Sequence, residues 1–154
     1  MILTEKETSV LKDLQTQEKV CMEHYTLCAN VAKDPALKDL FTQIAKDEQE
    51  HFQSLGKVIN GDTPTMPSSP AASKVDSYHP TAAYNASSNQ TDMQHDALLC
   101  SDSIGNEKMV SGEYNSDVFV FGDPDVRKLL ADIQIEEQNH AEMLYKYKTV
   151  NGMS

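Results

Sequence analysis

Apolar residues recur every three or four positions over two long stretches of the chain, and this spacing predicts amphipathic helices. In the first stretch, Asp34 precedes Pro35, a pair that favours a new helix because aspartate caps helix N-termini and proline suits the first turn. Thr4 and Glu7 have the spacing of a capping box at the beginning of this stretch. We therefore expect a helical hairpin over residues 4–60.

The same pattern occurs again at an offset of 89 residues, where Asp123-Pro124 repeats Asp34-Pro35. This repeat predicts a second hairpin over residues 92–151, whose first helix covers 92–121. Residues 118–121 (VFVF) have strand propensity, and we assign them to the helix because the repeat requires it.

Between the hairpins, residues 61–91 are rich in proline, serine, alanine and asparagine, which predicts a long crossover connection. Two antiparallel helical hairpins joined by such a crossover predict an all-α fold, a four-helix bundle in a single domain over residues 1–154.

Six polar residues interrupt the apolar stripes at positions that should face the core. Two glutamates lie at equivalent distances from the hairpin turn, one 16 residues before Asp34 and one 14 residues after it, and the repeat preserves this arrangement. Because a helix rises about 1.5 Å per residue, all six side chains should meet in one layer. The six are Glu18, Glu48, His51, Glu107, Glu137 and His140.

Burying four carboxylates together would cost many kcal/mol or force protons onto them, and two divalent cations remove that cost. Four carboxylates and two imidazoles are a ligand set for two iron or manganese ions. The Glu-x-x-His spacing places both groups on one helical face. A single such pair is common on solvated helix surfaces. Here the pair occurs twice, each time at the same distance from a hairpin turn and within an apolar stripe. This combination favours a metal site.

The net charge of −11 argues against nucleic acid as a partner, because phosphate binding needs clustered lysine or arginine. No apolar run is long enough to predict a membrane-spanning helix. The N-terminus lacks the basic and apolar regions of a secretory signal. Three cysteines without a C-x-x-C pair predict reduced thiols in a cytoplasmic protein.

The two Glu-x-x-His pairs, each combined with a glutamate of the preceding helix, resemble the ligand pattern of the ferritin-like dimetal carboxylate proteins, such as rubrerythrin, bacterioferritin and manganese catalase. The segments LQTQEKVCMEHY and IAKDEQEHFQSL most resemble the spore coat F family. The first resemblance implies that Glu48 and Glu137 bridge both metals. Glu18 and Glu107 would be terminal ligands, and each histidine would bind one ion.

The resemblance also implies residues that support the ligands. Tyr25 and Tyr114 would donate hydrogen bonds near the site, although aromatic packing in the core explains their positions equally well. Asp47 and Glu136 would accept a hydrogen bond from the far nitrogen of a liganding histidine, or else remain solvated beside the core. Val110 stands where rubrerythrin-type peroxidases carry an extra glutamate, which leaves the peroxidase mechanism open.

Two functions follow. The first is an oxidoreductase of the peroxidase, catalase or ferroxidase type, with oxygen or peroxide as substrate and no catalytic residue assigned beyond the ligands. The second is a structural or assembly protein of the bacterial spore coat, with other coat proteins as partners and a stabilising or vestigial metal site. The first predicts a cytoplasmic protein and the second a coat location. We also expect a homo-oligomer.

Overall fold

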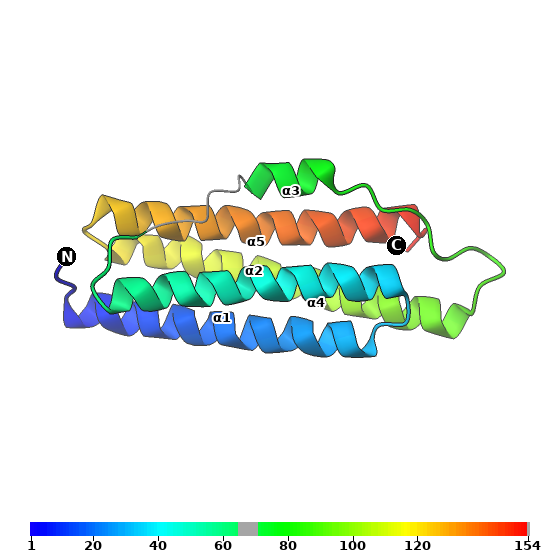
Figure 1. The fold of residues 1–154 in the computed structure, drawn as a ribbon, viewed down its shortest axis with the longest axis horizontal. Coiled ribbons are helices and arrows are strands. Elements are labelled where there is room, and N and C mark those ends of the chain that lie inside the picture. Colours follow the sequence, from blue (N-terminus) through cyan, green and yellow to red (C-terminus); the bar gives the residue numbers. More distant parts are fainter. Residues whose placement is uncertain (65–70, 154) are drawn as a thin grey trace.

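The computed structural model describes residues 1–64 and 71–153, and this part of the chain contains helices and no strands. The prediction of an all-α protein is therefore confirmed for the described residues. Four long helices lie side by side along the long axis of the molecule (Figure 1). They are α1 (Glu5–Val31), α2 (Pro35–Ile59), α4 (Gln90–Asp117) and α5 (Pro124–Val150).

The helices begin where local side chains satisfy the free backbone N–H groups of a first turn. At α1, the Thr4 hydroxyl accepts the Glu7 N–H at 3.1 Å, and the Glu7 carboxylate accepts the Thr4 N–H at 2.8 Å. Asp34 caps α2 and Asp123 caps α5 through side-chain oxygens, each followed by proline. The predicted capping box and both predicted Asp-Pro helix starts are confirmed.

The long helices form two antiparallel pairs, α1 with α2 and α4 with α5, and the pairs contact each other through α1 with α4 and α2 with α5. The buried apolar side chains divide into two clusters, one toward each end of the molecule. One cluster includes Tyr25, Phe41, Ile44, Cys100, Leu144 and Tyr147, and the other includes Leu14, Leu55, Tyr114, Leu130 and Ile133. Between them lies a layer of buried polar side chains.

The first helix of the second hairpin is shorter than predicted. It ends at Asp117 instead of residue 121, and the one-turn 3-10 helix η1 (Val118–Val120) follows. Phe121 and Asp123 are extended, with ψ values of 129° and 121°. A residue before proline is disfavoured in the α conformation, and the chain must reverse direction before Pro124. Phe121 is buried from this extended segment, whereas Phe119 is exposed.

The crossover predicted over 61–91 contains a short helix, α3 (Ala71–Ser77), which the sequence did not indicate. Part of the predicted crossover, residues 65–70, lies outside the described residues. Helix α3 lies against α5 (Figure 1), where Val75 is buried and its carbonyl oxygen accepts a hydrogen bond from Lys146 Nζ at 2.7 Å. Seven residues are too few to show helical periodicity in the sequence.

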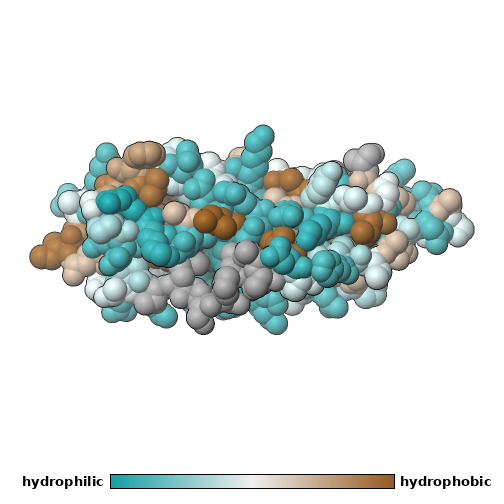
Figure 2. Space-filling model, turned by 90° about the horizontal axis from the view of Figure 1, so that it is seen from above, coloured by the Kyte–Doolittle hydropathy of each residue, from teal (hydrophilic) through white to brown (hydrophobic). Residues whose placement is uncertain are grey.

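The surface seen from the side of α3 is mostly hydrophilic, with hydrophobic side chains in small separate patches (Figure 2). Within the described part of the chain, no helix combines the length and the apolar character that crossing a membrane requires.

Candidate metal centre

The polar layer between the two apolar clusters contains the six residues predicted as metal ligands. They come from all four long helices, and none of the six is more than 1% exposed. One residue comes from α1, two from α2, one from α4 and two from α5, in the order Glu18, Glu48, His51, Glu107, Glu137 and His140. The fold therefore brings together side chains separated by more than a hundred positions in sequence.

These six residues form two interlocking groups of four. In each group, one nitrogen or oxygen atom from every residue lies within 4.8 Å of the others. Glu48 and Glu137 belong to both groups, while each remaining glutamate and histidine belongs to one. The first group consists of Glu18, Glu48, His51 and Glu137, and the second consists of Glu48, Glu107, Glu137 and His140.

The two histidines direct their Nδ1 atoms toward the carboxylates. His51 Nδ1 lies 2.9 Å from Glu137 Oε1, and His140 Nδ1 lies 2.9 Å from Glu48 Oε1. These short distances lack hydrogen-bond geometry, and both Nδ1 atoms are without a hydrogen-bond partner. The two imidazole rings are stacked with their centroids 6.1 Å apart. The two Nδ1 atoms and the carboxylate oxygens thus converge on shared points, as the donor atoms of a metal site do.

Carboxylate oxygens in the same layer are also buried without a hydrogen-bond partner. Both oxygens of Glu48 and of Glu137 are in this state, as is one oxygen of Glu18 and one of Glu107. Unpaired buried polar atoms are costly and rare in folded proteins. A pair of divalent cations would satisfy all of them, so the residues present fit such a group.

When no cation neutralises this layer, burial and mutual repulsion favour the protonated forms of Glu18 and Glu137. Burial and the neighbouring Glu48 raise the pKa of Glu18 to about 8. Burial and the charge of Glu107 raise the pKa of Glu137 well above its ordinary value. The pKa of Glu48 lies well below its ordinary range despite burial, because Glu18 and the two histidines lie close to its carboxylate. Cation binding would displace protons from the ligands.

The same carboxylates favour the protonated form of both histidines. Burial alone would lower their pKa values, but the negative charges of Glu18 near His51 and of Glu107 near His140 raise both pKa values well above the ordinary range. In the absence of metal ions, protonated imidazoles would balance part of the negative charge of the buried carboxylates.

Two tyrosines connect the helical hairpins at this layer. The Tyr25 hydroxyl in α1 donates a hydrogen bond to Glu107 in α4, and the Tyr114 hydroxyl in α4 donates one to Glu18 in α1. Both rings are buried, and burial together with the adjacent carboxylates raises the pKa of each phenol well above its ordinary value. Both hydroxyls therefore remain protonated donors.

The far nitrogen of each histidine contacts a carboxylate of the opposite hairpin. His140 Nε2 lies 3.1 Å from Asp47 Oδ2, and His51 Nε2 lies against Glu136 Oε2. A hydrogen bond from Nε2–H leaves Nδ1 free to bind a metal and fixes the orientation of the ring.

Three contacts near the site have no counterpart in the sequence pattern. Asp47 Oδ1 accepts hydrogen bonds from Lys74 Nζ at 2.8 Å and from Gln43 Nε2 at 3.1 Å. Burial would raise the pKa of Asp47, but hydrogen bonds from His140 and Lys74 hold it below its ordinary value. His24 is half-buried in α1, and its Nε2 lies 3.0 Å from the hydroxyl of Ser103.

The family model for the Coat F domain matches residues 95–154, which cover most of α4 and all of α5. No curated protein and no solved structure matches the chain. The matched span contains Glu107, Glu137 and His140, whereas the two segments that predicted the resemblance lie in the first hairpin. The predicted resemblance to the spore coat F family is thus confirmed in the second hairpin.

Proposed function

We propose that this protein is a spore coat protein built as a ferritin-like four-helix bundle, in which six buried side chains hold two divalent iron or manganese ions. The observation that carries the metal centre is the pair of interlocking donor groups that share Glu48 and Glu137. The Coat F domain match over residues 95–154 supports the coat role.

In this proposal the metal centre stabilises the fold. The six ligands come from all four long helices, so bound ions would connect the two hairpins at the middle of the molecule. An ion that binds only the folded chain contributes its binding free energy to folding. Without bound ions, the buried carboxylates would repel one another unless some of them were protonated.

The metal centre is tested by metal analysis of the full chain, purified without chelators. We expect close to two iron or manganese ions per chain by plasma mass spectrometry, and a higher melting temperature than that of the chelator-treated protein. A chain that binds neither metal after dialysis against micromolar Fe²⁺ or Mn²⁺ would show that the donor groups are not a metal site.

The coat role is tested separately by localisation. A fluorescently tagged copy expressed from its own promoter in a spore-forming host should concentrate at the periphery of the developing spore. Even distribution through the cytoplasm of growing cells, with no signal on spores, would rule out the coat role and would leave the metal centre unaffected.

A second candidate function is an oxidoreductase that acts on oxygen or peroxide. The number of protein ligands favours this function. Each donor group supplies four residues, and iron or manganese can bind further ligands beyond these four. When bound, such a metal pair supplies electrons to oxygen or peroxide. The protein would exclude water through its two apolar clusters and keep Tyr25 and Tyr114 as proton donors to the carboxylates.

This second candidate is tested by measuring oxygen and peroxide consumption by the metal-loaded chain with an added reductant. Multiple turnovers that disappear in a metal-depleted sample would support it. Full metal loading without turnover would leave the structural role as the function of the centre.

A further inference from the structure

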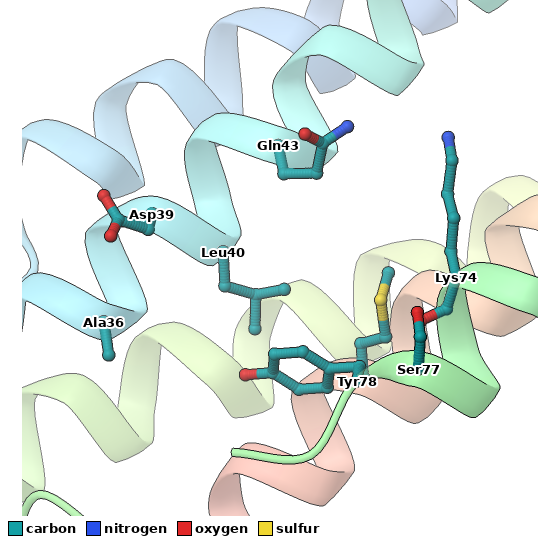
Figure 3. Close-up of a pocket in the computed structure, with 8 residues that line it drawn as sticks. Ala36, Asp39, Leu40, Gln43, Lys74, Ser77 and Tyr78 are labelled. Carbon is teal, nitrogen blue, oxygen red and sulfur yellow. The ribbon is translucent and has the colours of Figure 1, made fainter. Parts of the chain in front are cut away.

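A groove separates α3 from α2 beside the polar layer. It has a volume of about 440 Å³, and Figure 3 shows Leu40 and Gln43 of α2 facing Lys74 of α3 and Tyr78, the residue after α3, across it. The Lys74 ammonium and the Gln43 amide lie toward the same end of the groove. At that end both groups reach Asp47, whose carboxylate lies behind the proposed metal centre.

A chain of three side chains leads from α3 to that centre. Lys74 Nζ donates to Asp47 Oδ1 at 2.8 Å, and Asp47 Oδ2 lies 3.1 Å from Nε2 of His140. The Nδ1 atom of the same ring is among the donors of the second group. Lys74 is half-buried, so its contact with Asp47 is partly shielded from solvent.

We propose that Lys74 is a positioning residue for one half of the metal centre, because it fixes the Asp47 carboxylate that orients His140. This inference rests on the proposed metal centre and deepens it. Partners of this kind fix the ring orientation of a metal-binding histidine, and their loss typically lowers metal affinity about 10- to 100-fold.

The effect should be confined to one ion. The internal repeat aligns Asp47 with Glu136, the carboxylate that contacts the far nitrogen of His51. Among the described residues, Lys74 forms an ion pair with Asp47 and none with Glu136. Helix α3 is also outside the repeat, since it belongs to the crossover. The two halves of the centre are therefore supported differently, although their ligands are equivalent.

Lys74 also closes the space behind His140. A cavity of about 10 Å³ remains there, lined in part by Asp47, Lys74 and Asn139. A cavity of roughly this size holds one water molecule at most. Removing the lysine side chain would open the cavity to the groove, where water would compete with His140 for the Asp47 carboxylate.

The test compares three variants of the full chain. Lys74→Met removes the ammonium group, Lys74→Arg keeps a cation that can reach a carboxylate, and Lys146→Met removes a contact that attaches α3 to α5 without touching Asp47. Each metal-free protein is titrated with Mn²⁺, free Mn²⁺ is followed by electron paramagnetic resonance, and circular dichroism checks helix content.

We expect wild-type protein, Lys74→Arg and Lys146→Met to bind two ions with similar affinities. In Lys74→Met, the affinity for one ion should fall about 10- to 100-fold, while the other ion binds as in the wild type. Two unchanged ions in Lys74→Met would overturn this inference and leave the proposed function intact. The same loss in Lys146→Met would also overturn it, because α3 docking would then explain the effect. Failure of wild-type protein to bind Mn²⁺ or Fe²⁺ would reject both proposals.

Discussion

The hydroxyl of Tyr25 in the first hairpin donates a hydrogen bond to Glu107 in the second hairpin. Tyr114 and Glu18 form the same contact in the opposite direction. Each tyrosine therefore fixes a proposed ligand that belongs to the other half of the repeat. Replacing one tyrosine should disturb both the association of the hairpins and the binding of one metal ion.

Tyr25→Phe is expected to lower the free energy of unfolding of the metal-free protein by about 1 to 3 kcal/mol, because the buried Glu107 carboxylate loses a donor. Urea unfolding followed by circular dichroism measures this change. Tyr145→Phe is the matched control, since that ring is exposed on α5. Equal unfolding midpoints for the two variants would contradict the role given to the Tyr25 hydroxyl.

Glu48→Ala is expected to lose both metal ions, because Glu48 belongs to both donor groups. Glu18→Ala should lose one ion, since Glu18 belongs to one group only. Metal content after gel filtration, measured by plasma mass spectrometry, distinguishes these outcomes. Glu50→Ala, at an exposed position of the same helix as Glu48, should retain both ions. Retention of two ions by Glu48→Ala would show that the bridging assignment is wrong.

The metal-free protein should become less stable as the pH rises from about 5 to about 8. The pKa of Glu18 is about 8 in the folded protein and 4.5 ordinarily, so the folded chain keeps a proton that the unfolded chain releases. The raised pKa values of His51 and His140 act in the same direction, since their stabilisation is complete below the ordinary pKa and is lost above the folded one. The lowered pKa of Glu48 changes stability only at more acidic pH.

Urea unfolding at pH 5.5 and pH 8.5, with chelator and with saturating Mn²⁺, measures this pH dependence. The metal-loaded protein should show the opposite trend, because ligands bind metal in their deprotonated forms. A metal-free protein that is more stable at pH 8.5 than at pH 5.5 would contradict the protonation of the buried layer.

Asp96→Ala should destabilise the protein far from the metal centre, by about 3 kcal/mol. The buried Asp96 carboxylate accepts the backbone N–H groups of Lys33 and Asp34 at 2.9 Å each, and the Tyr84 hydroxyl at 2.6 Å. It thus joins the α1–α2 turn to the crossover and to α4. Asp102→Ala, at an exposed position of α4, should change the free energy of unfolding by less than about 0.5 kcal/mol. Metal content should be unchanged in both variants.

The sequence was sufficient to locate the long helices because their apolar periodicity and their caps agree. Asp34 and Asp123 occupy the N-cap positions that the Asp-Pro pairs predicted. The prediction failed at residues 118–121, which the repeat assigned to the helix despite their strand propensity. The chain must turn before Pro124, so the α-helix ends at Asp117. Helix α3 was missed because it is a single segment of seven residues, too short to show an apolar period.

For the candidate site, the repeat was informative because the same donor residues occur twice, each time at the same distance along the helix from the hairpin turn. The six donors converge in the structure, while their role as metal ligands stays a prediction. The contributions of Lys74 and Gln43 could not be found in this way. The contact of Lys74 depends on where the crossover lies on the bundle, and a spacing pattern within one helix contains no information about that placement. Gln43 and Asp47 are four residues apart in α2, so helical spacing places them on one face, but it does not show that the pair lies beside the site.

The direction of the contacts in the polar layer has a consequence for how the chain is organised. Each donor group takes three residues from one hairpin and one from the other, and the contacts of the tyrosines and of the far histidine nitrogens all run between hairpins. One hairpin therefore contains no complete half of the centre. The polar layer is thus the interface between two similar hairpins that the crossover joins covalently, and neither hairpin alone contains either donor group.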